Sequence, residues 1–198
     1  MIINEIIPEQ GFEKTRDAIG AILKLELDSQ KEKQQFIYPI DVYVGRSTPF
    51  HHSEEIMVNV LLDSGNASSI HERGSQDSNN FFIDIYVSSK ENSKNIGGYN
   101  ATKIRDKFIG MCRYILQNHR YKTLNLPLGC IMGTYVTGFE NFEPTNSQDS
   151  SFVKMSRLSY NVRVSENQKV WDGLEINSIF TKMKLDLTSK GYQCIYEK

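Results

Sequence analysis

The clearest alternation of hydrophobic and polar residues lies near the middle of the chain. Between 81 and 88 every second residue is apolar, and these residues share one face of an extended chain: Phe81, Ile83, Ile85 and Val87. The opposite face carries a mixed set: Phe82, Asp84, Tyr86 and Ser88. Because successive side chains of a strand point to opposite faces, this period of two predicts a half-buried strand.

The following segment has the period of a helix. After Gly97 and Gly98, we expect Asn100 to cap a helix that runs to His119. Its large apolar residues recur at steps of three and four: Ile104, Phe108, Met111 and Ile115. Most charged residues, Arg105 among them, fall off this stripe, and Cys112 lies beside it as a core thiol. The pattern predicts an amphipathic helix that packs on a sheet with its other side in water.

The same periodicities predict the remaining elements. They indicate a helix over 9–29 and strands over 37–44, 55–62, 131–139 and 152–164. The polar segments Asp63–Asn79 and Glu140–Ser151 are expected to be long loops, the first of them a hairpin loop. Beyond Ser165 the pattern is ambiguous: Ile179, Phe180, Met183 and Leu187 fit one face of a helix, and 191–196 fits a short strand.

This order of elements predicts an α+β fold. We expect a mainly antiparallel sheet with two helices packed on one face, long hairpin loops and a C-terminal extension. The expected division is an α+β domain over 1–164 and an extension over 165–198, which docks on the same domain or on a neighbouring subunit.

Composition narrows the classes of function. The chain of 198 residues has 23 Lys and Arg against 24 Asp and Glu, a net charge of −1, which excludes nucleic-acid binding through bulk positive charge. The three cysteines are widely spaced, so neither a disulfide framework nor a zinc site is expected. An acidic N-terminal segment and the lack of a long apolar run predict a soluble protein made in a cytoplasm.

Two strands carry the candidate functional residues. Phe82, Asp84 and Tyr86 combine large aromatic side chains with a carboxylate on a non-core face. This composition is typical of a protein–protein contact, and a second layer from the C-terminal segment would cover such a face equally well. Lys154, Arg157 and Arg163 form a basic row along the last long strand, either as plain surface charge or as a contact for a polyanion. No catalytic group, cofactor site or metal site is expected.

Two further interpretations stay open beside this one. Asp63, at the end of one predicted strand, and Asp84, in the neighbouring one, resemble the paired carboxylates of a metal-dependent nuclease, although the Glu-x-Lys that usually follows is missing. Alternatively, the face with Phe82 and Tyr86 belongs to an adaptor that binds another protein without forming a ring.

The order of elements resembles the tail-terminator and related neck proteins of long-tailed bacteriophages. The resemblance spans most of 8–164. It is carried by three segments: Pro8–Leu27, the strand Phe81–Val87 leading into the helix Asn100–Leu116, and the strand end Leu158–Val164. The chain is long for that family, and 165–198 has no obvious counterpart in it.

The resemblance implies a non-enzymatic virion protein, made in the bacterial cytoplasm. Such proteins assemble as a ring, commonly of six subunits, which ends tail-tube growth, joins the head connector and lets DNA pass through its lumen. By this analogy Asp63–Asn79 and Glu140–Ser151 would be docking loops, and Asp84, Arg157 and Arg163 would face a neighbouring subunit or the lumen.

Overall fold

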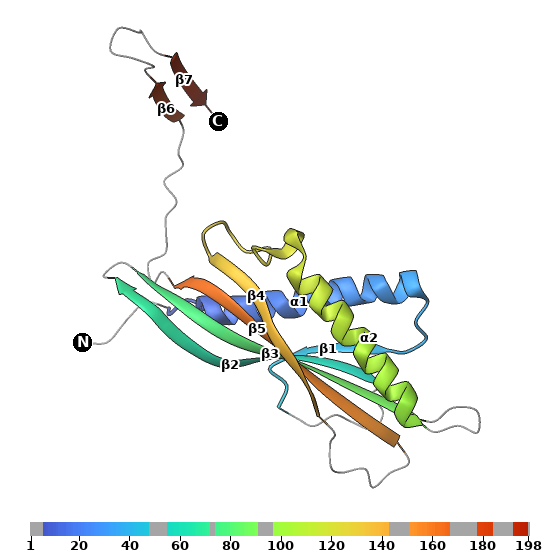
Figure 1. Ribbon diagram of the computed structural model, residues 1–198. Helices are drawn as coiled ribbons and strands as arrows, with labels where there is room; N and C mark the ends of the chain where they lie inside the picture. Colours follow the sequence, from blue (N-terminus) through green and yellow to red (C-terminus); the bar gives the residue numbers. More distant parts are fainter. Residues whose placement is uncertain are drawn as a thin grey trace. The chain divides into compact units, whose positions relative to one another are not determined.

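The computed structural model describes residues 6–47, 55–71, 74–90, 97–142, 151–166, 178–183 and 192–197. Its contacts divide the chain into two compact units, Met1–Asn167 and Gln168–Lys198. The first unit holds two long helices and a sheet of five strands, mostly antiparallel, so the predicted α+β fold is confirmed (Figure 1).

The sheet has the order β1-β2-β3-β5-β4. Its strands are β1 (Ile40–Val44), β2 (Ile56–His71), β3 (Gly74–Lys90), β4 (Ile131–Phe142) and β5 (Ser151–Glu166). Only the short edge strand β1 runs parallel to its neighbour, and the other three pairings are antiparallel. The predicted pairing of the strand after Glu55 with the Phe81 strand is therefore confirmed.

Both helices lie on the same side of this sheet (Figure 1). Helix α1 (Gly11–Gln34) packs on β1 and β2, and α2 (Gly97–Gln117) packs on β3 and β5; a short 3-10 helix, η1 (His119–Tyr121), follows α2. At the start of α1, the Gln10 and Glu13 side chains bond to each other's backbone N–H groups. The helix begins two residues later and ends five residues later than predicted, and Gln35 follows it in the left-handed conformation, with a φ of 54°.

The core lies between the helices and one face of the sheet. The alternating residues Phe81, Ile83, Ile85 and Val87 are all fully buried in it, together with Leu158, Tyr160 and Val162 of the adjacent strand β5. Directly opposite residues of paired strands share a face, so the register of β3 with β5 fixes this layer. The period of two therefore predicted the core face of β3 correctly.

The buried stripe of α2 differs from the predicted one. Phe108 and Ile115 are buried, but Ile104 and Met111 lie at the rim, and Arg105, predicted to face water, is only 7% exposed. Its guanidinium group binds the Asp106 carboxylate at 2.8 Å, which keeps the charge paired while the aliphatic stem is covered. Helix α2 also begins at Gly97, three residues before the predicted cap at Asn100.

The segment 63–79 is not the predicted loop. Strands β2 and β3 continue through it as far as His71 and Gly74, with two register shifts in β2. The polar side chains pair with one another across three strands: Asn161 donates from Nδ2 to Ser78 Oγ (2.9 Å) and Asn80 Oδ1 (2.6 Å), and Asn80 donates to Ser64 Oγ (3.1 Å). These bonds satisfy polar groups that would otherwise favour a loop, so the hairpin extends.

The second unit holds a two-stranded antiparallel sheet of β6 (Ser178–Met183) and β7 (Tyr192–Glu197). The short strand expected near 191–196 is confirmed, whereas the helical alternative for 179–183 is wrong. Most of the second predicted loop, 143–150, lies outside the described residues. No helix in the described part of the chain is both long and apolar enough to cross a membrane.

The buried core predicts how stability depends on pH. Burial raises the pKa of the Cys112 thiol to about 12, and burial also raises the pKa of the Tyr160 hydroxyl to about 12. The unfolded chain loses these protons at lower pH than the native protein, so stability must fall as pH rises toward 12. The fall starts near pH 9 for the thiol and near pH 10 for the phenol, with a slope of up to about 1.4 kcal/mol per pH unit for each group. Urea unfolding at pH 8 and pH 10.5 measures the loss.

The variant Cys112→Ala removes the thiol contribution. We expect its stability to fall less steeply over the same pH range than that of the natural chain. An equal slope in both proteins would contradict the assignment of this pH dependence to Cys112.

Candidate functional site on the helix-free face of the sheet

The face of the sheet opposite the two helices carries the residues that the sequence singled out. We call it the open face and define it by the side chains that alternate with the core positions of the central strands: Asn59 and Leu61 of β2, Phe82, Asp84 and Tyr86 of β3, and Met155, Arg157 and Ser159 of β5. Tyr135 and Phe142 of β4 extend this face, since they lie opposite Asn161 and Met155. No described helix covers it (Figure 1).

An ion pair lies at the centre of the open face. Asp84 and Arg157 are directly opposite in the register of β3 with β5, and the guanidinium group donates from Nε at 2.7 Å and from Nη2 at 2.8 Å to the two oxygens of the carboxylate. The Asp84 side chain is 2% exposed and that of Arg157 is 30% exposed. This bidentate geometry holds the arginine in one orientation.

Two aromatic rings flank the same arginine. The guanidinium carbon lies 4.2 Å from the centre of the Phe82 ring and 5.8 Å from that of Phe142. The quadrupole of each ring attracts the cation, and the contact with Phe82 has the shorter distance. Asp84, Arg157, Phe82 and Phe142 therefore form one rigid group, which we call the arginine cluster.

Residues after β1 fold over the neighbouring part of the open face. Asn59 accepts from the backbone N–H of Arg46 at 3.1 Å and donates to its carbonyl at 2.8 Å. The Arg46 guanidinium lies 4.3 Å from the centre of the Tyr43 ring and 3.4 Å from the Met57 sulfur. Asn59 and Met57 are consequently buried, although no described helix packs on this side.

The predicted contact residues are brought together, but they are not equally accessible. Phe82 and Tyr86 are half-buried, whereas Asp84, expected to be exposed, is buried by its pairing with Arg157. Burial of the Tyr86 hydroxyl, and then the nearby Asp84 charge, raise the pKa of Tyr86. The open face therefore presents aromatic rings and an arginine whose charge is already balanced.

The three residues of the predicted basic row do not share one face of the sheet. Arg157 and Arg163 share the open face, but Lys154 lies opposite the fully buried Val87 and belongs to the face that carries the helices. The reason is the period of two, since residues three apart on a strand point to opposite faces. Arg157 is engaged by Asp84, while Arg163 is exposed and lies over Gly133 at the other end of the face.

The carboxylates considered for a nuclease have other partners. Both oxygens of Asp84 accept from Arg157, and the Asp63 carboxylate accepts from the Ser64 hydroxyl at 3.0 Å. Asp63 also lies at a register shift of β2, while Asp84 pairs with Asn59, four residues earlier on that strand. In the described part of the chain no group of three or more His, Cys, Asp or Glu could hold a metal ion.

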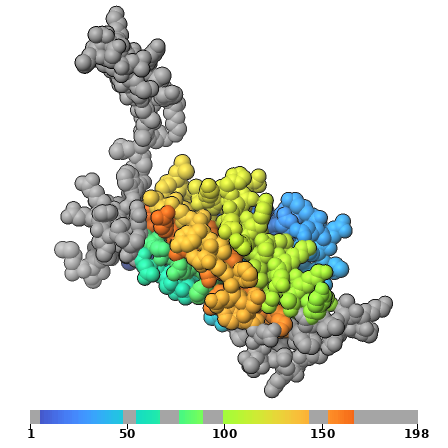
Figure 2. All heavy atoms as spheres, viewed as in Figure 1, coloured from blue at the N-terminus to red at the C-terminus, as the bar shows by residue number. Residues whose placement is uncertain are grey.

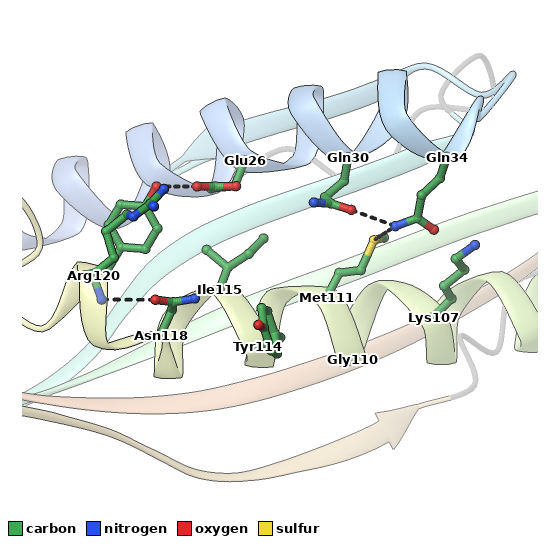
Figure 3. A pocket seen from close by; sticks show the side chains of 11 residues that line it. Glu26, Gln30, Gln34, Lys107, Gly110, Met111, Tyr114, Ile115, Asn118 and Arg120 are labelled. Atoms are coloured by element: carbon green, nitrogen blue, oxygen red, sulfur yellow. Dashed lines mark hydrogen bonds between the residues drawn. The ribbon is translucent and has the colours of Figure 1, made fainter.

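The sequence did not predict a groove between the helices. It has a volume of about 360 Å³ and lies between α1 and α2 near η1 (Figure 3). Gln34 donates to Gln30 at 2.8 Å and contacts the Met111 sulfur at 3.8 Å across its upper part, and the Tyr121 hydroxyl donates to Glu26 at its end. The hydrogen bond to Glu26, and then burial of the hydroxyl, raise the pKa of Tyr121.

The outer edge of β4 is the second surface that the sequence did not single out. Exposed apolar side chains occur along the whole strand and on both faces of it. Tyr135 and Phe142 belong to the open face, Phe139 lies opposite the buried Leu158, and Met132 lies at a register shift. Figure 2 shows the yellow and orange band of β4 uncovered on the face turned to the viewer. The sequence did indicate an apolar strand, because Glu140 is the one charged residue in these 12 positions. It could not show that this strand lies at the edge of the sheet, since that depends on the topology.

Comparison with known proteins gave no match, either to a protein-family model or to a curated protein.

Proposed function

We propose that this chain is a structural protein of the bacteriophage neck, a tail terminator or a related component, that assembles as a closed ring of identical subunits at the top of the tail. The ring, with six subunits favoured, would end tail-tube growth, join the head connector and let DNA pass through its lumen. The protein would then reside in the virion and act without a catalytic group, cofactor or metal.

The arginine cluster is the observation that supports this proposal most. Protein interfaces are enriched in aromatic residues and arginine, and the residues that dominate binding are those held rigid in a packed setting. Arg157 is fixed by two hydrogen bonds to Asp84 and by the ring of Phe82, so little conformational entropy is lost when a partner covers it. The exposed rings of Tyr135 and Phe142 enlarge the surface that a neighbour would bury.

The element order adds a weaker argument. The chain order is α1, β1, the long strand pair of β2 and β3, α2, β4 and β5. The five strands form one sheet, and both helices lie on one side of it. Apart from the long hairpin loop, this order is the one on which the resemblance to tail-terminator proteins rests, and the open face is left for assembly. A nuclease is less well supported, because both oxygens of Asp84 are occupied by Arg157.

A charge placed on the open face tests this proposal. Tyr135→Glu puts a carboxylate at a position where the side chain is 52% exposed, so the subunit should still fold. The dissociation constant between subunits should rise at least tenfold, which corresponds to a loss of about 1.4 kcal/mol or more, as expected for a strong interface residue. Sedimentation velocity over a range of concentrations, with negative-stain imaging of rings, gives the result.

Tyr114→Glu is the matched control. Tyr114 is 74% exposed on α2, on the side of the molecule that carries the helices, and its substitution should leave assembly unchanged. A natural chain that stays monomeric at high concentration, or rings that tolerate both substitutions equally, would overturn the proposal. Loss of a different protein partner without any ring would favour the adaptor instead.

A further inference from the structure

We infer that the outer edge of β4 binds the β6–β7 hairpin of a second copy of this chain, which adds its strands to the five-stranded sheet of that copy. This inference rests on the proposed ring and names a partner for a surface other than the arginine cluster. Two features of the molecule, an unprotected strand edge and a hairpin of only two strands, lead to it.

The edge of β4 has the properties of a strand that pairs further. It is the last strand in the sheet order, and among the described residues no strand pairs with its outer side. Proteins usually protect such an edge with Lys, Pro or inward charges, yet β4 has neither Lys nor Pro and carries a single acidic residue, Glu140. Met132 and Phe139, each 49% exposed, add apolar surface that a paired strand would cover.

The hairpin lacks what it needs for stability by itself. It consists of two strands of six residues that form a sheet separate from the five-stranded one. A hairpin of two strands is marginally stable in water and requires a third strand or a packing surface. Its register pairs Ile179 with Tyr196 and Met183 with Tyr192.

The lengths of the two elements are compatible. A strand of six residues is about 20 Å long and β4, with 12 residues, about 40 Å, so the whole hairpin strand fits along this edge. The eleven residues between Glu166 and Ser178 can span at most about 40 Å. That reach allows the hairpin to meet an adjacent subunit, and in a ring each subunit would donate one hairpin and accept another.

Complementation between two full-length variants tests this exchange. Thr181→Pro in β6 removes a backbone donor and should prevent the hairpin from adding to another sheet, while leaving β4 intact. The double variant M132K/F139K puts lysine on the β4 edge and should prevent acceptance while leaving the hairpin intact. Each variant alone should assemble at least tenfold more weakly. An equal mixture should form one-to-one complexes, because the lysine variant supplies an intact hairpin and the proline variant supplies an intact β4 edge.

Hydrogen exchange provides the second measurement. Amides of 131–142 and of 178–183 should be protected together in the assembled natural chain and lose protection together on dilution to monomers, and Thr181→Pro should lower protection in 131–142. Tyr114→Lys on α2 is the control and should change neither protection nor assembly.

The possible failures are distinguishable. A ring that forms normally with Thr181→Pro, or with freely exchanging β4 amides, would overturn the hairpin exchange and leave the ring proposal standing. A monomer whose β4 and hairpin are protected at every concentration would place the hairpin on its own sheet and overturn the exchange. A natural chain without any oligomer would contradict both proposals.

Discussion

Replacing Arg157 with alanine is expected to lower the free energy of unfolding by about 3 kcal/mol. The substitution leaves the Asp84 carboxylate, which is 2% exposed, without either of its two hydrogen bonds. Breaking a buried ion pair by removing one partner typically costs 3–5 kcal/mol, and the partial exposure of Arg157 places this case at the lower end. Urea unfolding followed by circular dichroism measures the change.

Two comparisons separate this effect from a general loss of packing. Arg163→Ala removes an exposed arginine from the same strand and the same face, and it should change stability by no more than about 0.5 kcal/mol. The double variant D84A/R157A removes both charges, so it should be more stable than the sum of the two single changes predicts. If the stability losses of the two single variants simply added in D84A/R157A, or if Arg163→Ala lost as much stability as Arg157→Ala, the ion pair of Asp84 with Arg157 would not be the cause of the loss.

The sequence predicted which residues share a face but not how the strands meet. The period of two placed Phe82, Asp84 and Tyr86 together on the non-core side of β3, and the structure has them there. The neighbour of β3 and the register between them are set by tertiary packing, so the pairing of Asp84 with Arg157 was not predicted. Opposite charges near the middle of two predicted strands were the available signal.

The loop predicted over 63–79 and the missed edge of β4 were wrong for the same reason, because both depend on contacts between segments distant in sequence. The segment 63–79 has a composition that disfavours strands. Hydrogen bonds of Asn80 and Asn161 to residues of neighbouring strands allow β2 and β3 to extend through it, and these bonds cannot be predicted from the segment alone. The exposed edge of β4 depends on the order of strands in the sheet, which hydrophobic periodicity does not contain. The two surfaces most suited to assembly were thus only partly predictable, because each is completed by neighbours distant in sequence.

Replacing Phe81 with alanine should have the largest effect of any single change discussed, a loss of about 3–5 kcal/mol. Phe81 is fully buried in the middle of the sheet, where it lies opposite Leu62 on β2 and Tyr160 on β5. Alanine would leave a cavity that three strands and their hydrogen-bonded ladders cannot close, so the cost of the cavity adds to the lost burial. Thermal and urea unfolding of the full chain give the measurement.

Phe139→Ala is the matched control for this cavity, because the same side chain is 49% exposed on β4. It should cost about 1 kcal/mol in a monomer, since only part of its surface leaves water on folding. The effect on assembly should be the opposite. Phe139→Ala should weaken association through the β4 edge, whereas the folded fraction of Phe81→Ala should still associate at the same concentrations. A Phe81→Ala protein as stable as the natural chain would mean that this face of β3 is not the core side, and the assignment of the open face would then fail with it.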